Sequence, residues 1–189
     1  MSKLEAVSIT KSFGDNTILQ DVSLRLEPRE IVCLLGVSGG GKTTLFNVLS
    51  GLTLPDRGQV FLDGREITGK AGHISYMLQK DLLMPYRTVL DNIALPLIIK
   101  GAPKKEARRK ALEHFAEVWA VRQQKSSIPL SFRGMRQRAA LLRTYLCSEG
   151  AALLDEPFSA LDALTKASIH RWYLEVMEQI ELSTLFIHP

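Results

Sequence analysis

The chain has 189 residues, of which 46% are hydrophobic and 23% are charged, with a formal net charge of +4. This length fits one domain, or one domain with a small lobe, and the composition excludes a disordered, collagen-like or disulfide-stapled chain. The positive charge permits anionic partners, but a solvated surface explains it more simply than nucleic acid binding. Cys33, one of two cysteines, lies in an apolar run, so we expect it to be a buried, reduced thiol.

The first eighty residues predict a β-rich region. Val22, Leu24 and Leu26 alternate with polar residues, which is typical of a half-buried strand. Asp63-Gly64 stands between two short apolar runs and indicates a hairpin turn. The run at 31–35 is wholly apolar and predicts a buried strand. We therefore expect strands at 3–10, 17–27, 31–35, 59–62, 66–67 and 74–78.

From about residue 81 to residue 148 the pattern becomes helical. In one predicted helix, apolar residues between 111 and 119 share one face, and this stripe indicates core packing rather than a cofactor-binding face. The basic run at 104–110 is expected to be the solvated face of the same helix. A strand at 150–155, a helix at 163–181 and a strand at 183–187 complete the α/β layout. The apolar stripe comprises Ala111, Leu112, Phe115, Val118 and Trp119.

A glycine-rich loop between the strand at 31–35 and a helix at 42–50 matches the phosphate-binding pattern G-x-x-x-x-G-K-[ST]. Its glycines let backbone N–H groups surround phosphate oxygens, and the helix start adds partial positive charge. Lys42 can reach the β- and γ-phosphates, and the Thr43 hydroxyl can ligate Mg²⁺. A glycine-rich turn that binds nothing would not need this lysine and threonine. The expected ATP-binding residues are Gly36, Val37, Ser38, Gly39, Gly40, Gly41, Lys42, Thr43 and Thr44.

An apolar strand at 151–154 ends in two carboxylates, Asp155 and Glu156. In proteins with a phosphate loop, a carboxylate at this place holds Mg²⁺, and Asp155 is the candidate. Glu156 could act as the general base that activates a water molecule. The alternative is a strand end capped by two solvated acids, and the upstream phosphate loop favours the catalytic interpretation.

With these motifs the sequence resembles the ATP-binding subunit of an ABC transporter over essentially its whole length. The resemblance implies a P-loop NTPase core with an amino-terminal antiparallel β subdomain and a helical insertion at about 81–148. The resemblance implies that Phe13 stacks on adenine, although a core phenylalanine is the alternative. It also implies that Gln79 senses Mg²⁺ and the attacking water. Gly134–Arg138 match the end of the signature motif and the start of its helix, and Ser159–Asp162 match the D-loop at the dimer interface.

Residues 82–93 look like the importer branch that handles nitrate, sulfonate, taurine or pyrimidine precursors. The resemblance implies ATP and Mg²⁺ as cofactors and a head-to-tail homodimer that drives a transmembrane permease, with a solute-binding protein as an indirect partner. It implies no nucleic acid. No apolar run approaches the roughly 20 residues of a membrane span, so we expect a cytoplasmic protein that is peripheral on the inner face of the cell membrane.

The sequence departs from the family pattern at two places. The family signature reads Leu-Ser-Gly-Gly-Gln, whereas the stretch here, Leu130–Met135, contains Phe132 and Arg133. Aligned from its right end, the stretch has Phe132 in place of the serine and Arg133 in place of the first glycine; aligned from its left end, it keeps Leu-Ser and has one residue inserted. Either alignment damages the contact with the partner's nucleotide, which needs a hydroxyl and a close backbone approach. The alternative is that Arg133 acts as a cation on the phosphate. Near the end, His188 stands one position earlier than the histidine that contacts the γ-phosphate in the family. The family's later strands and helix are absent, so we expect one side of the sheet to be exposed.

Several functions share this site architecture. The leading hypothesis is an ATPase that energises a solute importer, and the second is a divergent or truncated ATP-binding module with little or no turnover. An ATPase acting on DNA would need long coiled-coil arms, but the sequence has no sustained heptad repeat. A GTPase would need an Asn-Lys-x-Asp motif, which the sequence also lacks. Measured ATP turnover separates the first two hypotheses.

Overall fold

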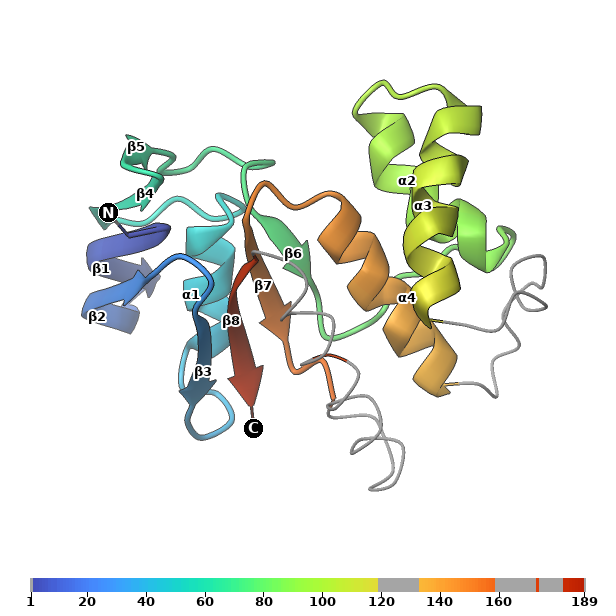
Figure 1. The fold of residues 1–189 in the computed structure, drawn as a ribbon. Coiled ribbons are helices and arrows are strands. Elements are labelled where there is room, and N and C mark those ends of the chain that lie inside the picture. Colours follow the sequence, from blue (N-terminus) through green and yellow to red (C-terminus); the bar gives the residue numbers. More distant parts are fainter. Residues whose placement is uncertain (1, 119–132, 159–172, 174–181, 189) are drawn as a thin grey trace.

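The computed structural model describes residues 2–118, 133–158, 173 and 182–188 (Figure 1). Within these ranges the chain forms two four-stranded sheets, one antiparallel and one parallel, and four helices. In chain order the elements are β1 (Leu4–Phe13), β2 (Asn16–Leu26), β3 (Ile31–Leu35), α1 (Lys42–Leu49), β4 (Arg57–Leu62), β5 (Arg65–Glu66), β6 (Ser75–Met77), α2 (Val89–Ile99), α3 (Lys104–Val118), α4 (Arg133–Leu146), β7 (Ala151–Asp155) and β8 (Ser183–His188).

The antiparallel sheet has the strand order β2-β1-β4-β5. The predicted turn after β4 is confirmed, because Leu62 pairs with Arg65 across it. Its central residues, Asp63 and Gly64, have φ values of 49° and 73°, which are typical of the tight turn that matches strand twist. The predicted alternation in β2 is also confirmed, since residues 22, 24 and 26 are more buried than their polar neighbours.

The parallel sheet has the strand order β3-β8-β7-β6. All five residues of the central strand β7 are buried, as expected for a strand covered on both faces. Because the strands are parallel, their carboxyl ends meet at one edge. The phosphate loop follows β3, Gln79 follows β6 and Glu156 follows β7, so all three lie at these carboxyl ends.

Strand β3 lies at the edge of the parallel sheet, and this position corrects one sequence prediction. Cys33 is exposed rather than buried, and its neighbours on the same face, Ile31 and Leu35, are 37% and 70% exposed. Side chains alternate across a strand, so only Val32 and Leu34 face the core. The apolar run at 31–35 correctly predicted a strand. How far its side chains are buried depends on which strands lie beside it in the sheet, and the local sequence does not specify them.

Helix α1 packs between the two sheets (Figure 1). Its residues Leu45, Phe46, Val48 and Leu49 are buried in one apolar cluster with side chains from both sheets. This packing connects the phosphate loop, at the start of α1, rigidly to the rest of the fold.

Helices α2, α3 and α4 gather beside β6 and β7 on the side away from the antiparallel sheet (Figure 1). The expected stripe on α3 is confirmed at Ala111, which is fully buried. Leu112 packs partly against the same cluster. The rest of the predicted stripe, at 115–119, falls outside the side chains that the structure describes. Of the predicted helix at 163–181 the structure describes only Tyr173, which is helical and buried. The basic run at 104–110 is solvated as predicted, apart from Ala107 and the partly covered Arg108.

None of the helices in the described ranges combines the length and the apolar character needed to cross a bilayer.

Gly51 is predicted to be essential for stability, because it ends α1 with a φ of +76°. A Cβ at this position would lie 2.4 Å from the backbone carbonyl carbon and oxygen of Lys70. We expect Gly51→Ala to lower the free energy of unfolding by about 3 kcal/mol. Gly101 is the control, because its φ is +95° but a Cβ there would meet nothing within 4 Å. Gly101→Ala should cost only about 1 kcal/mol. Urea unfolding compares them, and equal losses would contradict the role of the Lys70 contact.

Candidate nucleotide-binding and catalytic site

The glycine-rich loop at 36–41 joins the carboxyl end of β3 to the first residue of α1. Gly39 and Gly41 adopt left-handed φ values of +79° and +82°. A Cβ on Gly41 would also lie 3.0 Å from the Ile18 side chain, so both conformation and close packing require glycine. No side chain in the described structure caps the start of α1. Its first N–H groups and its dipole are therefore available to an anion.

The Lys42 ammonium group is folded onto the loop itself. Its Nζ donates hydrogen bonds to the carbonyl oxygens of Gly36, at 2.5 Å, and Val37, at 2.8 Å. The positive charge is thus already positioned inside the curve of the loop. Phosphate oxygens are stronger acceptors than neutral carbonyl groups, so a bound nucleotide can take over these hydrogen bonds.

Thr43 and Asp155 come together although 112 residues separate them in the chain. Thr43 Oγ1 donates to Asp155 Oδ2 at 3.1 Å, and Tyr76 Oη donates to the same oxygen at 3.3 Å. Burial raises the pKa of Asp155 above its usual value, although the two hydrogen bonds partly oppose that shift. Burial and the neighbouring Asp155 charge also raise the pKa of Tyr76, so this phenol keeps its proton and remains a donor.

The donor set at Thr43 and Asp155 fits Mg²⁺. It consists of hard oxygen atoms, a hydroxyl and a carboxylate, which this ion prefers. The described residues contain no cluster of three or more His, Cys, Asp or Glu side chains able to cage a metal. Mg²⁺ is usually bound by one or two protein groups together with substrate phosphates and water.

Glu156 and Gln79 form the second polar contact at this edge. Gln79 Nε2 donates to Glu156 Oε2 at 2.8 Å, which links the residues that follow β6 and β7. Glu156 has a φ of +47°, a left-handed conformation that is uncommon for residues other than glycine. Such backbone strain concentrates at functional sites. The turn directs the Glu156 carboxylate to Gln79, whereas Asp155 stays buried beside Thr43.

The structure also places the two residues expected at the margins of the site. Phe13, at the end of β1, is 54% exposed, which excludes the alternative of a core phenylalanine. The Lys11 ammonium lies 5.4 Å from the centre of its ring. His188 ends β8 and pairs in register with Leu35, directly before the phosphate loop. Both residues therefore have positions compatible with their predicted roles, which remain predictions.

Two predicted motifs lie partly or wholly outside the described residues. These are the D-loop match at 159–162 and the first part, 130–132, of the signature stretch. The structure does place the rest of the signature stretch, because α4 begins at Arg133. This agrees with the prediction that Gly134–Arg138 start a helix.

Sequence reasoning missed three contacts at this edge. Tyr76 was assigned only to a strand, although its hydroxyl supports Asp155 and its ring packs against Phe46. The ion pair between Asp81 and Arg136 was also missed. The available signals were a tyrosine three residues before Gln79 and an acid two residues after it, but neither pattern identifies a partner.

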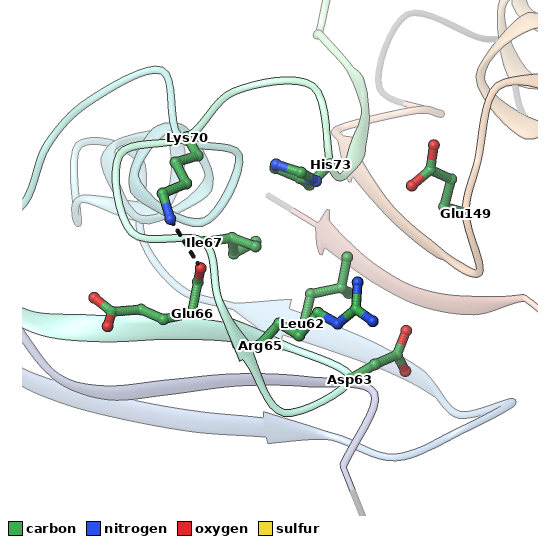
Figure 2. Close-up of a pocket in the computed structure, with 8 residues that line it drawn as sticks. All are labelled: Leu62, Asp63, Arg65, Glu66, Ile67, Lys70, His73 and Glu149. Atoms are coloured by element: carbon green, nitrogen blue, oxygen red, sulfur yellow. Dashed lines mark hydrogen bonds between the residues drawn. The ribbon is translucent and has the colours of Figure 1, made fainter.

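A cavity of about 540 Å³ lies at the opposite edge of the parallel sheet (Figure 2). His73 precedes β6 and Glu149 precedes β7, so both mark the amino ends of parallel strands. The phosphate loop lies at the carboxyl ends, and the cavity is therefore separate from it. The lining residues are Leu62, Asp63, Arg65, Glu66, Ile67, Lys70, His73 and Glu149.

Comparison with known proteins gives consistent results. A family model described as ABC transporter matches residues 19–159. The chain is 39% identical over 183 residues to the formylaminopyrimidine import ATP-binding protein ThiZ of Halalkalibacterium halodurans, covering 97% of this chain and 71% of that protein. It is also 39% identical over 183 residues to the taurine import ATP-binding protein TauB of Pseudomonas aeruginosa, covering 95% and 70%.

Two solved structures share the fold. The ATP-binding cassette MJ0796, a dimer in a post-hydrolysis state bound to ADP and Pi, has a TM-score of 0.80 and 27% identity. The match covers 97% of this chain and 87% of that one. A nucleotide-free ATP-binding cassette from an ABC transporter has a TM-score of 0.87 at 21% identity, over 100% of this chain and 82% of that one. These likenesses agree with the fold class expected from the sequence.

Proposed function

The chain belongs to the ABC transporter family, and from this membership we propose that it binds ATP with Mg²⁺ and hydrolyses it to energise import of a solute through a membrane-embedded permease. The named relatives ThiZ and TauB are import ATP-binding proteins. Their names suggest a small organic solute, such as a formylaminopyrimidine or a sulfonate like taurine. The MJ0796 cassette, which carries ADP and Pi, supports the nucleotide chemistry.

The observation that carries this proposal is the pair of contacts at the carboxyl edge of the parallel sheet. Thr43 meets Asp155 at 3.1 Å, and Gln79 meets Glu156 at 2.8 Å. The first contact brings together two oxygen donors that suit a metal–phosphate site, next to the glycine-rich loop. The second gathers a candidate base and a polar partner. Phosphoryl transfer requires mainly this positioning and charge stabilisation.

Each side chain has a defined task in the proposed reaction. Lys42 and the loop N–H groups bind the β- and γ-phosphates, and Thr43 with Asp155 would hold Mg²⁺. When bound, Mg²⁺ neutralises charge that develops on the phosphate oxygens. Glu156 accepts a proton from the attacking water, and Gln79 orients the Glu156 carboxylate. Phe13 stacks on adenine and His188 contacts the γ-phosphate.

The proposed partners follow from the dimeric MJ0796 cassette and from the importers. Two copies of this chain close head to tail around two ATP molecules, so that the phosphate loop of each faces the signature stretch of the other. A transmembrane permease binds the dimer at the inner face of the membrane, and a solute-binding protein delivers the solute to that permease.

ATP turnover by the purified chain tests the proposal. With Mg²⁺ present, we expect turnover in the unmodified chain and only background in Lys42→Ala, because this change removes the ammonium group that sits in the loop. Lys70→Ala is the matched control. Lys70 is an exposed lysine on the cavity at the opposite edge, and its loss should leave turnover unchanged. Turnover that persists in Lys42→Ala would contradict the proposal.

A second candidate function is an ATP-binding module with little or no turnover. Phe132 and Arg133 in the signature stretch favour it, because they interrupt a motif whose hydroxyl and glycines approach the partner's nucleotide in the family. ATP binding by a folded chain without hydrolysis would support this candidate over the first.

A further inference from the structure

The segment at 79–83 leaves the carboxyl end of β6 and contains Gln79. Two residues after Gln79, the Asp81 carboxylate accepts a bidentate pair of hydrogen bonds from Arg136 of α4. Arg136 Nε donates to Oδ2 at 2.7 Å, and Arg136 Nη2 donates to Oδ1 at 2.6 Å. The side chains of Arg136 and Asp81 are only 20% and 18% exposed. A shielded fork of this kind fixes both distance and orientation.

A second arginine on α4 binds the backbone of the same segment. Arg143 Nη2 donates to the carbonyl oxygen of Asp81 at 2.5 Å, and Nη1 donates to that of Leu82 at 3.0 Å. Arg143 follows Arg136 by seven residues, or about two helical turns, so the two arginines share one face of α4. The Leu83 N–H also donates to Asp81 Oδ1 at 3.0 Å.

These contacts surround a strained residue. Leu82 has a φ of +45°, and a leucine in this region is an outlier that persists only when its surroundings impose it. Arg143 binds the carbonyl groups of Asp81 and Leu82, which belong to the peptide groups before and after the Leu82 Cα. Burial disfavours the Asp81 carboxylate, but hydrogen bonds from Arg136 and Leu83 outweigh this effect, so the pKa of Asp81 lies below its usual value. The pair is therefore ionised at neutral pH.

We propose that Asp81, Arg136 and Arg143 are positioning residues that hold Gln79 against Glu156. None of the three belongs to the groups assigned above to the nucleotide, to Mg²⁺ or to the attacking water. They act by fixing the backbone two residues after Gln79, whose Nε2 lies 2.8 Å from Glu156 Oε2. The inference rests on the proposed ATPase function. It adds a physical link between the first turn of α4, which contains the end of the signature stretch, and the candidate base.

Arg136→Ala and Arg136→Lys test this role in the full-length chain. Lysine keeps the charge but loses the planar fork. We expect Arg136→Ala to lower kcat about 10- to 100-fold with little change in KM for ATP, because misplacing a catalytic group by about 1 Å can cost about 100-fold. Arg136→Lys should restore part of the loss. The matched control is Arg109→Ala, which breaks an exposed Arg109–Glu113 pair on α3 and should leave both constants unchanged.

Amide hydrogen exchange gives a readout that does not depend on turnover. In Arg136→Ala we expect faster exchange at 79–83 and also at 155–157, whereas the phosphate loop at 36–43 should keep its wild-type rates. A purely structural role in the helices would accelerate exchange within α4 but leave 155–157 unchanged. If Arg136→Ala does not fold, Arg136→Lys decides by the same two measurements.

The outcomes separate the two proposals. If the unmodified chain shows no turnover above Lys42→Ala, the proposed function fails, and the exchange rates at 155–157 decide the positioning role. If the unmodified chain turns over ATP but Arg136→Ala has a normal kcat, the positioning role is overturned and the proposed function stands. Unchanged exchange at 155–157 in Arg136→Ala also overturns the positioning role.

Discussion

Replacing Glu156 with glutamine is expected to lower kcat for ATP hydrolysis about 100-fold or more. The new side chain keeps an oxygen that can accept the hydrogen bond from Gln79 Nε2, now 2.8 Å from the carboxylate, but it cannot take a proton from water. ATP affinity should therefore stay close to that of the unmodified chain. Phosphate release gives kcat, and equilibrium binding of ATP gives the affinity.

The control for this experiment is Glu113→Gln, which makes the same chemical change in an exposed ion pair on α3. We expect it to retain full turnover. If Glu156→Gln also turns over ATP at the unmodified rate, Glu156 is not the general base, and its contact with Gln79 serves only to order the segment. A loss of ATP binding in Glu156→Gln would likewise contradict the prediction, because it would move the effect from catalysis to binding.

Asp155→Asn is expected to abolish Mg²⁺-dependent turnover and at the same time to stabilise the metal-free chain by about 1 kcal/mol at neutral pH. The residue is only 4% exposed, and burial raises the pKa of its carboxyl group, so folding disfavours the charged form. Thr43 and Tyr76 donate to one oxygen, Oδ2, and an amide oxygen can accept both hydrogen bonds. The charge is then needed for the metal rather than for the fold.

The sign of the pH dependence follows from the raised pKa of Asp155. The protonated Asp155 carboxyl makes its full contribution to the folding free energy below the ordinary aspartate pKa of about 3.9. This contribution is lost as the pH rises through the pKa that Asp155 has in the folded chain. The variant has no such loss, so its advantage should be largest at neutral pH and should vanish near pH 4. Thermal unfolding in the presence of a chelator measures this difference. A variant that is less stable than the unmodified chain at neutral pH would refute the argument.

Sequence reasoning succeeded where a short stretch of chain determines its own conformation. The phosphate loop is one example, because glycines at φ of +79° and +82° and a following helix start are local features. The hairpin at Asp63-Gly64 is another. The acidic end of β7 was also recognisable, since a buried apolar strand followed by two carboxylates is visible in the sequence itself.

The tertiary structure decided which residues that are distant in the chain contact one another. Cys33 is exposed because β3 lies at a sheet edge, and strand order is set by long-range pairing rather than by the five residues of the strand. Tyr76 and Asp155 meet across 79 residues, and Asp81 and Arg136 across 55. An aspartate or arginine in the sequence does not name its counterpart, because ion pairs and hydrogen bonds form wherever packing brings the groups together. The amino-acid sequence by itself therefore determined the chemistry available at the site, and only the folded chain determined which groups act on one another.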